Sequence, residues 1–150
     1  MKLLPIELDV SLNNRFSENP ACAAILSVYP GYYSRVGFKK PWIGYFATID
    51  GVEIVGCGGY KGQPQEGRIE IAYNTFKDFE GKGIGTEICR QLVLLSLQTN
   101  PLIKITARTL VEISGSTTIL ERNNFKCMGV VCDKEDGDVW EWEYKKSNPL

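Results

Sequence analysis

The chain has 150 residues, and its 17 lysines and arginines nearly balance its 18 aspartates and glutamates. A chain of this length is typical of one domain, so we expect residues 1–150 to fold as a single unit, and the balanced charge gives no general attraction to nucleic acid or to an acidic membrane surface. The sequence contains no histidine, which excludes Ser-His-Asp and Cys-His nucleophilic machinery and removes the commonest general base and metal ligand.

The first part of the chain predicts a strand and a helix. Residues 6–10 alternate apolar and acidic side chains, as a half-buried strand does. A helix is expected over residues 20–29, where Ser17 or Asn19 can cap it and Pro30 ends it.

An irregular segment and a hairpin follow this helix. Residues 32–40 mix aromatic, basic and glycine residues without a clear period, and they either line an acceptor site or form a surface loop with a few packed aromatics. Residues 42–49 and 52–60 are typical of two strands around Asp50-Gly51, a strong signal for a two-residue turn. We therefore expect an antiparallel hairpin before the middle of the chain.

Residues 68–98 carry the strongest functional signal. Residues 68–76 are rich in β-branched and aromatic side chains, as strands are, and isoleucines and leucines from Ile84 to Leu95 recur at the spacing of one helical face. Between this strand and this helix lies Gly-Lys-Gly-Ile-Gly, residues 81–85.

This glycine loop predicts an anion site at the start of a helix. Alternate glycines let backbone N–H groups converge, and the unpaired N–H groups and dipole of the helix act at the same spot, as in pyrophosphate sites. Lys82 adds a point charge, whereas a flexible turn before the helix is the plainer alternative. The pattern is not a dinucleotide fingerprint, because Thr86 stands at the last glycine position, and it is not a Walker loop, because Gly83 follows Lys82.

The last part of the chain predicts a strand, a short helix and a closing hairpin. Residues 102–109 are typical of a strand, and a short helix begins at Ser114 or Ser116 and ends at Asn123-Asn124, which supplies a left-handed stop. The hairpin consists of strands over residues 125–132 and 139–145, with the acidic turn of residues 133–138 between them.

The cysteines and the last strand bear on location and assembly. The five cysteines lack a Cys-x-x-Cys pair, so we expect reduced core residues in a cytoplasmic protein, without disulfides or a metal site. No apolar run reaches the roughly 18 residues that span a bilayer, so a membrane is not an expected partner. The balanced charge gives no reason to expect nucleic acid as a partner either. The cysteines are Cys22, Cys57, Cys89, Cys127 and Cys132.

Trp140, Trp142 and Tyr144 share one face of the last strand, and that face is either core or a subunit contact, so a monomer and a homodimer are both open.

The order of these elements resembles the GNAT superfamily of acetyl-CoA-dependent N-acetyltransferases. Residues 80–85 match that family's pyrophosphate loop, Gln/Arg-x-x-Gly-x-Gly/Ala, except at Glu80. Residues 70–73 and 116–125 resemble the branch that acetylates ribosomal-protein N-termini, and the likeness covers about residues 42–144. The resemblance implies a mixed α/β (α+β) fold, with a mixed, mostly antiparallel central sheet of six to seven strands and about four flanking helices.

The resemblance also implies how acetyl-CoA binds. The main chain of Tyr73, Asn74 and Thr75 would hold the pantetheine arm as if it were a further strand. A strand N–H near Asn74 would meet the oxyanion that develops on the thioester. The pyrophosphate would be held by Gly81, Lys82, Gly83, Ile84, Gly85 and Thr86.

Two residues are the implied catalytic groups. Glu70 would be the general base, directly or through water, unless it is a sheet-face charge paired with Arg68 or Lys104. Ser116 would donate to the leaving thiolate, although it can also cap a helix. The tyrosine that many relatives place five residues before the Gly-Phe phenylalanine is Leu120 here.

The implied reaction moves an acetyl group from acetyl-CoA to a primary amine by direct attack on the thioester in a ternary complex. The acceptor would be a small molecule or a protein amine. A catalytically inactive coenzyme-A-binding module is the alternative within the family. A phosphate-binding or protein-interaction domain unrelated to acyl transfer is the alternative outside it.

Overall fold

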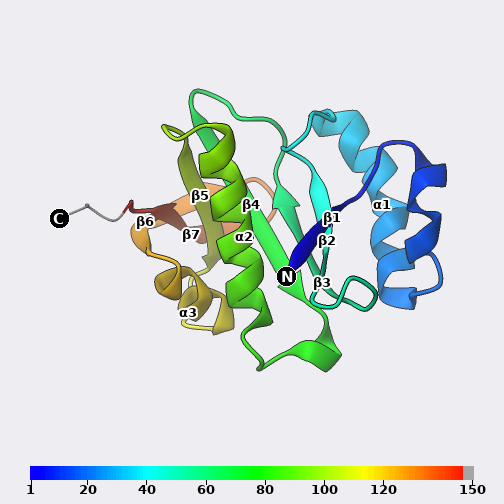
Figure 1. Ribbon diagram of the computed structural model, residues 1–150. Helices are drawn as coiled ribbons and strands as arrows, with labels where there is room; N and C mark the ends of the chain where they lie inside the picture. Colours follow the sequence, from blue (N-terminus) through cyan, green and yellow to red (C-terminus); the bar gives the residue numbers. More distant parts are fainter. Residues whose placement is uncertain (147–150) are drawn as a thin grey trace.

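One seven-stranded sheet organises the molecule (Figure 1). The computed structural model describes residues 1–146. In spatial order the strands are β1 (Lys2–Pro5), β2 (Gly44–Thr48), β3 (Ile54–Tyr60), β4 (Arg68–Thr75), β5 (Lys104–Leu110), β7 (Gly137–Tyr144) and β6 (Phe125–Asp133). The helices are α1 (Pro20–Val36), α2 (Ile84–Thr99) and α3 (Gly115–Arg122), with the 3-10 helices η1 (Val10–Phe16) and η2 (Lys77–Phe79).

The sheet is antiparallel everywhere except between β4 and β5. These two strands are parallel and pair over only three positions, from Arg68 opposite Lys104 to Glu70 opposite Thr106. Beyond them β4 continues along β3 and β5 continues along β7. The sheet is therefore split between the ends of β4 and β5. The predicted fold class, a mixed and mostly antiparallel sheet with flanking helices, is confirmed.

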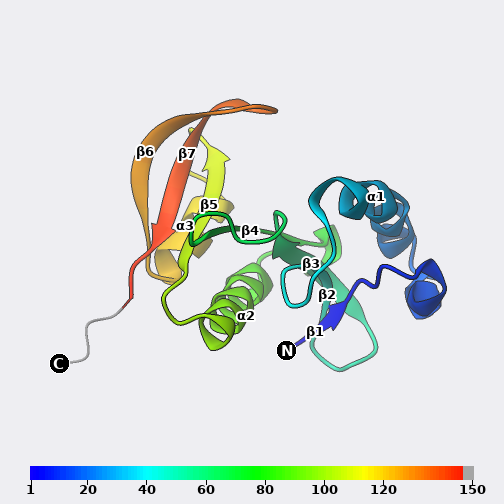
Figure 2. The ribbon, with the colours of Figure 1, turned by 90° about the horizontal axis from the view of Figure 1, so that it is seen from above.

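The helices cover opposite faces of the sheet, as the view from above shows (Figure 2). On one face, α2 presents Ile88 and Leu92, which are fully buried. Both side chains pack closely against Gly58 of β3, in the space that a Cβ on this glycine would need. On the other face, the buried Tyr33 of α1 accepts a hydrogen bond from the N–H of Gly44 and donates one to the Ile6 carbonyl. These contacts fix α1 beside β2 and the residue that follows β1.

The strand predicted over residues 6–10 was wrong, and the predicted first helix was too short. The first strand is β1, and residues 6–10 lead into η1 because the Asp9 carboxylate caps that helix by accepting from Ser11 N. Helix α1 is capped by Asn19 and continues through Pro30 to Val36. Pro30 forfeits one helix hydrogen bond, but it is exposed, and the packing of the tyrosines beyond it onto the sheet offsets that loss. The irregular segment is therefore confined to residues after Val36.

The later elements follow the predictions closely. The β2–β3 hairpin forms, but its connection is five residues long, residues 49–53, because Asp50 accepts hydrogen bonds from Val52 N and Glu53 N. Ser114, not Ser116, caps α3 through a capping box with Thr117. The acidic turn joins β6 to β7 as expected.

The remaining expectations concern burial. Trp142 is buried in the core, as one of the two predictions for its face required. All five cysteines are free, and Cys22 and Cys89 are buried, whereas Cys132 is exposed and is not a core residue. Across residues 1–146, no helix combines the length and the apolar character needed to cross a membrane.

Candidate functional site

The split in the sheet exposes one edge of β4. The carbonyl of Glu70 accepts from Lys61 N, and Phe76 N donates to the Val55 carbonyl, so these even-numbered residues direct their backbone groups toward β3. Backbone groups alternate in direction along a strand, so the N–H and C=O groups of Tyr73 and Thr75 point into the split. The N–H of Asn74, which the sequence analysis placed near the oxyanion, points the other way, toward β3.

The glycine loop leads from β4 to α2 in the geometry that an anion site requires. Gly81 and Gly83 have φ of 77° and 78°, a conformation that glycine adopts without strain, and open space lies where a Cβ would stand at each. Gly83 is the N-cap of α2, and the first hydrogen bond of the helix runs from Glu87 N to the Gly83 carbonyl. The N–H groups at residues 84–86 precede that bond, so they are available to an anion.

A pocket of about 570 Å³, here called the loop pocket, lies between this loop, β4 and α3. It brings together most of the residues that the sequence analysis selected, including Ser116. Lys82 is not among its lining residues, and its ammonium lies 5.8 Å from the centre of the Phe79 ring. The lining residues are Tyr73, Asn74, Thr75, Phe79, Glu80, Gly81, Gly83, Ile84, Gly85, Thr86, Ser114, Gly115, Ser116, Thr118, Ile119 and Arg122.

Helix α3 contributes pocket residues that the sequence analysis missed. Gly115, Thr118, Ile119 and Arg122 line the loop pocket. Their spacing of three and four is that of one helical face, which is the signal that could have found them. Arg122 supplies a cation, whereas the exposed Glu80 adds a carboxylate to the same pocket.

Tyr73 connects β4 with α3 across the loop pocket. Its hydroxyl donates to the Ser116 carbonyl at 3.4 Å. Burial raises the pKa of Tyr73 above its ordinary value, and the nearby Cys89 adds to that shift. Ser116 is the second residue of α3 and is exposed, and the capping role belongs to Ser114. The Ser116 hydroxyl is therefore not needed to cap the helix.

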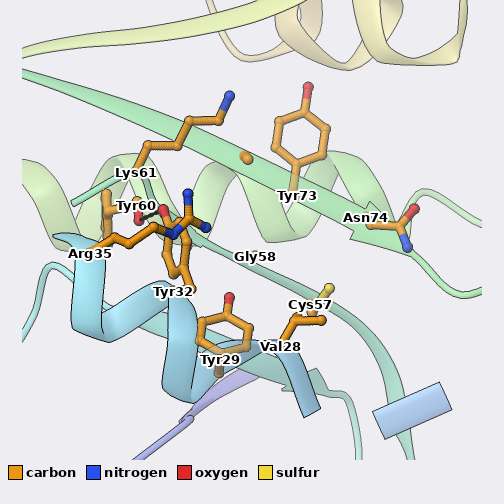
Figure 3. Close-up of a pocket in the computed structure, with 12 residues that line it drawn as sticks. Val28, Tyr29, Tyr32, Arg35, Cys57, Gly58, Tyr60, Lys61, Tyr73 and Asn74 are labelled. Carbon is orange, nitrogen blue, oxygen red and sulfur yellow. Dashed lines mark hydrogen bonds between the residues drawn. The ribbon is translucent and has the colours of Figure 1, made fainter. Parts of the chain in front are cut away.

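A second pocket of about 350 Å³, here called the α1 pocket, lies between α1 and the strands β3 and β4 (Figure 3). It shares Tyr73 and Asn74 with the loop pocket. Of the segment 32–40, which was expected either to line an acceptor site or to form a surface loop, Tyr32 and Arg35 line this pocket, but from a helix. The lining residues are Val28, Tyr29, Tyr32, Arg35, Cys57, Gly58, Gly59, Tyr60, Lys61, Ala72, Tyr73 and Asn74.

Glu70 lies beside the α1 pocket and is ion-paired. It alternates along β4 with Ala72 and Asn74, so it shares their face of the sheet. Its carboxylate lies 2.7 Å from the ammonium of Lys61 and 3.8 Å from the Arg108 guanidinium. The expected partners were Arg68 and Lys104, which pair instead with other acids. Partial burial would lower the pKa of Lys61, but the hydrogen bond and charge of Glu70 raise it above its ordinary value.

Comparisons with known proteins agree with this architecture. The GNAT acetyltransferase domain model matches residues 19–126. The uncharacterized N-acetyltransferase YjdG of Bacillus subtilis (strain 168) is 32% identical over 109 residues, which span 72% of this chain but only 60% of that relative. This chain therefore corresponds to less than two thirds of that relative's length.

Solved structures share the fold at low sequence identity. A spermidine N-acetyltransferase chimera from Vibrio cholerae and hSSAT superposes with a TM-score of 0.70 at 13% identity, covering 96% of this chain and 95% of that one. The aminoglycoside acetyltransferase AAC(6')-Ib in complex with coenzyme A gives 0.69 at 19% identity, covering 97% and 94%. Together with the family model that matches most of its length, these findings show that the chain belongs to the GNAT acetyltransferase family.

Proposed function

We propose that the chain is an acetyl-CoA-dependent N-acetyltransferase that acetylates a primary amine in a ternary complex. The observation that carries the proposal is the junction of the two pockets at Tyr73 and Asn74, on the part of β4 that β5 leaves unpaired. The loop pocket ends at the available backbone N–H groups of residues 84–86, and the α1 pocket is lined by aromatic rings. A thioester lying along β4 would reach the junction from the first pocket, and an amine would reach it from the second.

The residues of the loop pocket fit coenzyme A. The backbone groups of Tyr73 and Thr75 that face the split would pair with the pantetheine amides as a further strand would. The open N–H groups of residues 84–86 and the free space at Gly81 and Gly83 would accept the pyrophosphate. Lys82 would add only a diffuse positive charge, because its ammonium is directed to Phe79.

In the proposed reaction, the neutral amine nitrogen attacks the thioester carbonyl carbon, a C–N bond forms, and the C–S bond breaks. The Tyr73 N–H would stabilise the oxyanion that develops in between. Glu70 would take the proton that the amine loses, through water, since it lies on the acceptor face next to Lys61. The Ser116 hydroxyl would donate a hydrogen bond to the leaving thiolate.

Three finer predictions accompany this proposal. Neighbouring structures are named for spermidine and aminoglycoside acceptors, which supports an amine acceptor without fixing which one. The likeness of residues 116–125 to the branch that acetylates ribosomal-protein N-termini keeps a protein amine among the candidates. A cytoplasmic location is supported by the free cysteines.

Calorimetric titration with acetyl-CoA, run beside NAD and ATP, tests the proposal. We expect selective micromolar binding that Gly83→Asp abolishes by filling the loop and adding a negative charge. Gly51→Asp is the matched control, because Gly51 has a φ of 86° and open space like Gly83 but lies in the β2–β3 connection. Absent binding by the wild type, or equal loss in both variants, would overturn the coenzyme assignment.

Thiol release in the presence of an amine panel tests turnover separately. An N-acetyltransferase releases free coenzyme A only when an acceptor amine is present, and Gly83→Asp stops that release. A catalytically inactive coenzyme-A-binding module would bind acetyl-CoA in the titration but release no thiol with any amine. That combination of results would replace the proposed activity with the alternative.

A further inference from the structure

We infer that the acceptor is a small amine with an aromatic or apolar body that separates the reacting nitrogen from a carboxylate, and that Arg35 binds this carboxylate. The inference rests on the proposed function, because it assigns the α1 pocket to the acceptor. It adds the chemical class of that acceptor and a specificity-determining residue.

Helix α1 lines the α1 pocket with two tyrosine rings, Tyr29 and Tyr32, which meet edge to face with their centres 5.7 Å apart. The Tyr32 hydroxyl donates to the Tyr60 carbonyl at 3.3 Å. The rings of Tyr60 and Tyr73 lie on the opposite face of the sheet, where their hydroxyls donate to Leu92 of α2 and to Ser116 of α3. With its hydroxyl bound to the main chain, Tyr32 offers the pocket mainly ring surface. Ring surface in a pocket of about 350 Å³ suits a small aromatic or apolar body.

The charge of the α1 pocket is positive, and one cation is free to bind a ligand. Arg35 and Lys61 are the charged side chains that line it. Lys61 is already paired with Glu70 at 2.7 Å. The Arg35 guanidinium lies 5.7 Å from the centre of the Tyr32 ring and forms no ion pair with any of residues 1–146. A planar guanidinium held over a ring is suited to binding a carboxylate.

The position of Arg35 sets where the carboxylate lies on the acceptor. Figure 3 shows Arg35 and Lys61 at one end of the α1 pocket and Asn74 at the other. Asn74 lies at the junction with the loop pocket, where the proposed reaction takes place. The reacting nitrogen and the carboxylate therefore belong at opposite ends of the acceptor.

Among residues 1–146, no carboxylate lines the α1 pocket, and Glu135, whose charge reaches Tyr32, lies outside it. Glu70 is held by Lys61, and Asp133 lies 3.0 Å from the Arg108 guanidinium. Glu112 and Asp136 line a separate pocket, which Lys61 also lines. A second ammonium on the acceptor would meet Arg35 in the α1 pocket and would be repelled.

A series of benzylamines that differ only in the para substituent tests the inference through turnover. We expect kcat/KM with acetyl-CoA to fall in the order 4-(aminomethyl)benzoate, benzylamine, 1,4-bis(aminomethyl)benzene, because only the group opposite the amine changes from anionic to absent to cationic. Arg35→Glu replaces attraction of the carboxylate by repulsion. It is therefore expected to lower the ratio of kcat/KM for 4-(aminomethyl)benzoate to kcat/KM for 1,4-bis(aminomethyl)benzene by about tenfold or more. Arg15→Glu is the matched control, since Arg15 also lies over an aromatic ring, Phe16, but outside the pocket.

A binding measurement keeps the inference separate from the proposed function. We expect 4-methylbenzoate, which has no amine, to bind the wild type and Arg15→Glu alike and to bind Arg35→Glu at least about fivefold more weakly. Arg35-dependent binding without turnover of any amine would sink the proposed activity but keep the ligand class. Turnover that prefers the diamine, or benzoate binding that Arg35→Glu leaves unchanged, would overturn the inference and leave the proposed activity standing.

Discussion

The carboxylate of Glu70 lies 2.7 Å from the ammonium of Lys61, and this ion pair stands at the edge of the α1 pocket. If Glu70 is the base, Glu70→Gln should lower kcat about 100-fold at neutral pH with little change in KM. The loss should shrink toward pH 9, because solvent then deprotonates more of the amine. Because the pKa of Lys61 is raised above its ordinary value of 10.5, its ammonium loses its proton only above that pH. The wild-type ion pair therefore stays intact up to pH 9.

Lys61→Met separates the role of the base from that of the ion pair. This change removes the partner but leaves the Glu70 carboxylate in place, so it should cost much less activity than Glu70→Gln. Thiol-release kinetics from pH 6 to pH 9 measure both variants. Equal losses with parallel pH profiles would mean that Glu70 acts only by holding Lys61.

The two charges that face the loop pocket should have opposite effects on coenzyme affinity. Arg122→Gln should weaken binding of acetyl-CoA several-fold, and Glu80→Gln should strengthen it several-fold, because the pyrophosphate is anionic. Both side chains are exposed, so both effects should fade at 1 M salt. Calorimetry at low and high salt measures them, with Asp78→Asn as a nearby control outside the pocket. Weaker binding by Glu80→Gln would contradict the placement of the pyrophosphate.

Gly85 supports the loop pocket by close packing. A Cβ at this position would lie 2.7 Å from Ile119 Cδ1 and 3.1 Å from Thr75 Oγ1. Gly85→Ala should therefore cost about 1 kcal/mol of unfolding free energy even though alanine favours a helix. In an Ile119→Val background, which lacks Cδ1, the same change should become neutral or stabilising. Urea unfolding of the four proteins measures this coupling, and an equal cost in both backgrounds would refute the contact.

The features that the sequence predicted correctly are local. The glycine loop, the cap choices at α3 and the turn before β7 depend on residues within a few positions of one another, and each formed. Asn124, which adopts the left-handed conformation with φ of 64°, is likewise a feature predicted from residues next to it. The mostly antiparallel sheet, by contrast, was implied by the resemblance of the element order to the GNAT superfamily.

The features that the sequence did not predict depend on contacts between distant segments. Helix α1 passes Pro30 because Tyr33 bonds to Ile6 and Gly44, which no local pattern indicates. The partner of Glu70 is Lys61 because β3 and β4 are in register with Tyr60 opposite Ile71. That register could not be read through the irregular loop that joins the two strands, so the part of the α1 pocket that β3 lines was missed as well.

The last strand places Trp142 in the core, and this determines how its removal should act. Trp142 is 4% exposed, and its Nε1 donates to Thr109 Oγ1 at 3.0 Å. Trp142→Ala should cost about 3–5 kcal/mol and lower Tm equally at every protein concentration. Trp140→Ala, which removes a less buried ring from the same face, should cost less. A loss of Tm confined to dilute Trp142→Ala samples would instead indicate a homodimer interface.

The β6–β7 turn should make the stability of the fold depend on pH under acidic conditions. Hydrogen bonds from Glu135 N, Arg108 and Asp136 N hold the pKa of Asp133 at about 2, below its ordinary value of 3.8. A depressed carboxyl pKa stabilises the fold above the ordinary value, and this stabilisation is lost as pH falls from about 4 to about 2. In Asp133→Asn that dependence is absent, so Tm should lie below the wild type at pH 5, and the two should converge by pH 2. Thermal unfolding between pH 5 and pH 2 measures the gap, with Asp136→Asn as the control from the same turn. A gap that stays constant to pH 2 would mean that the Asp133 charge does not stabilise the turn.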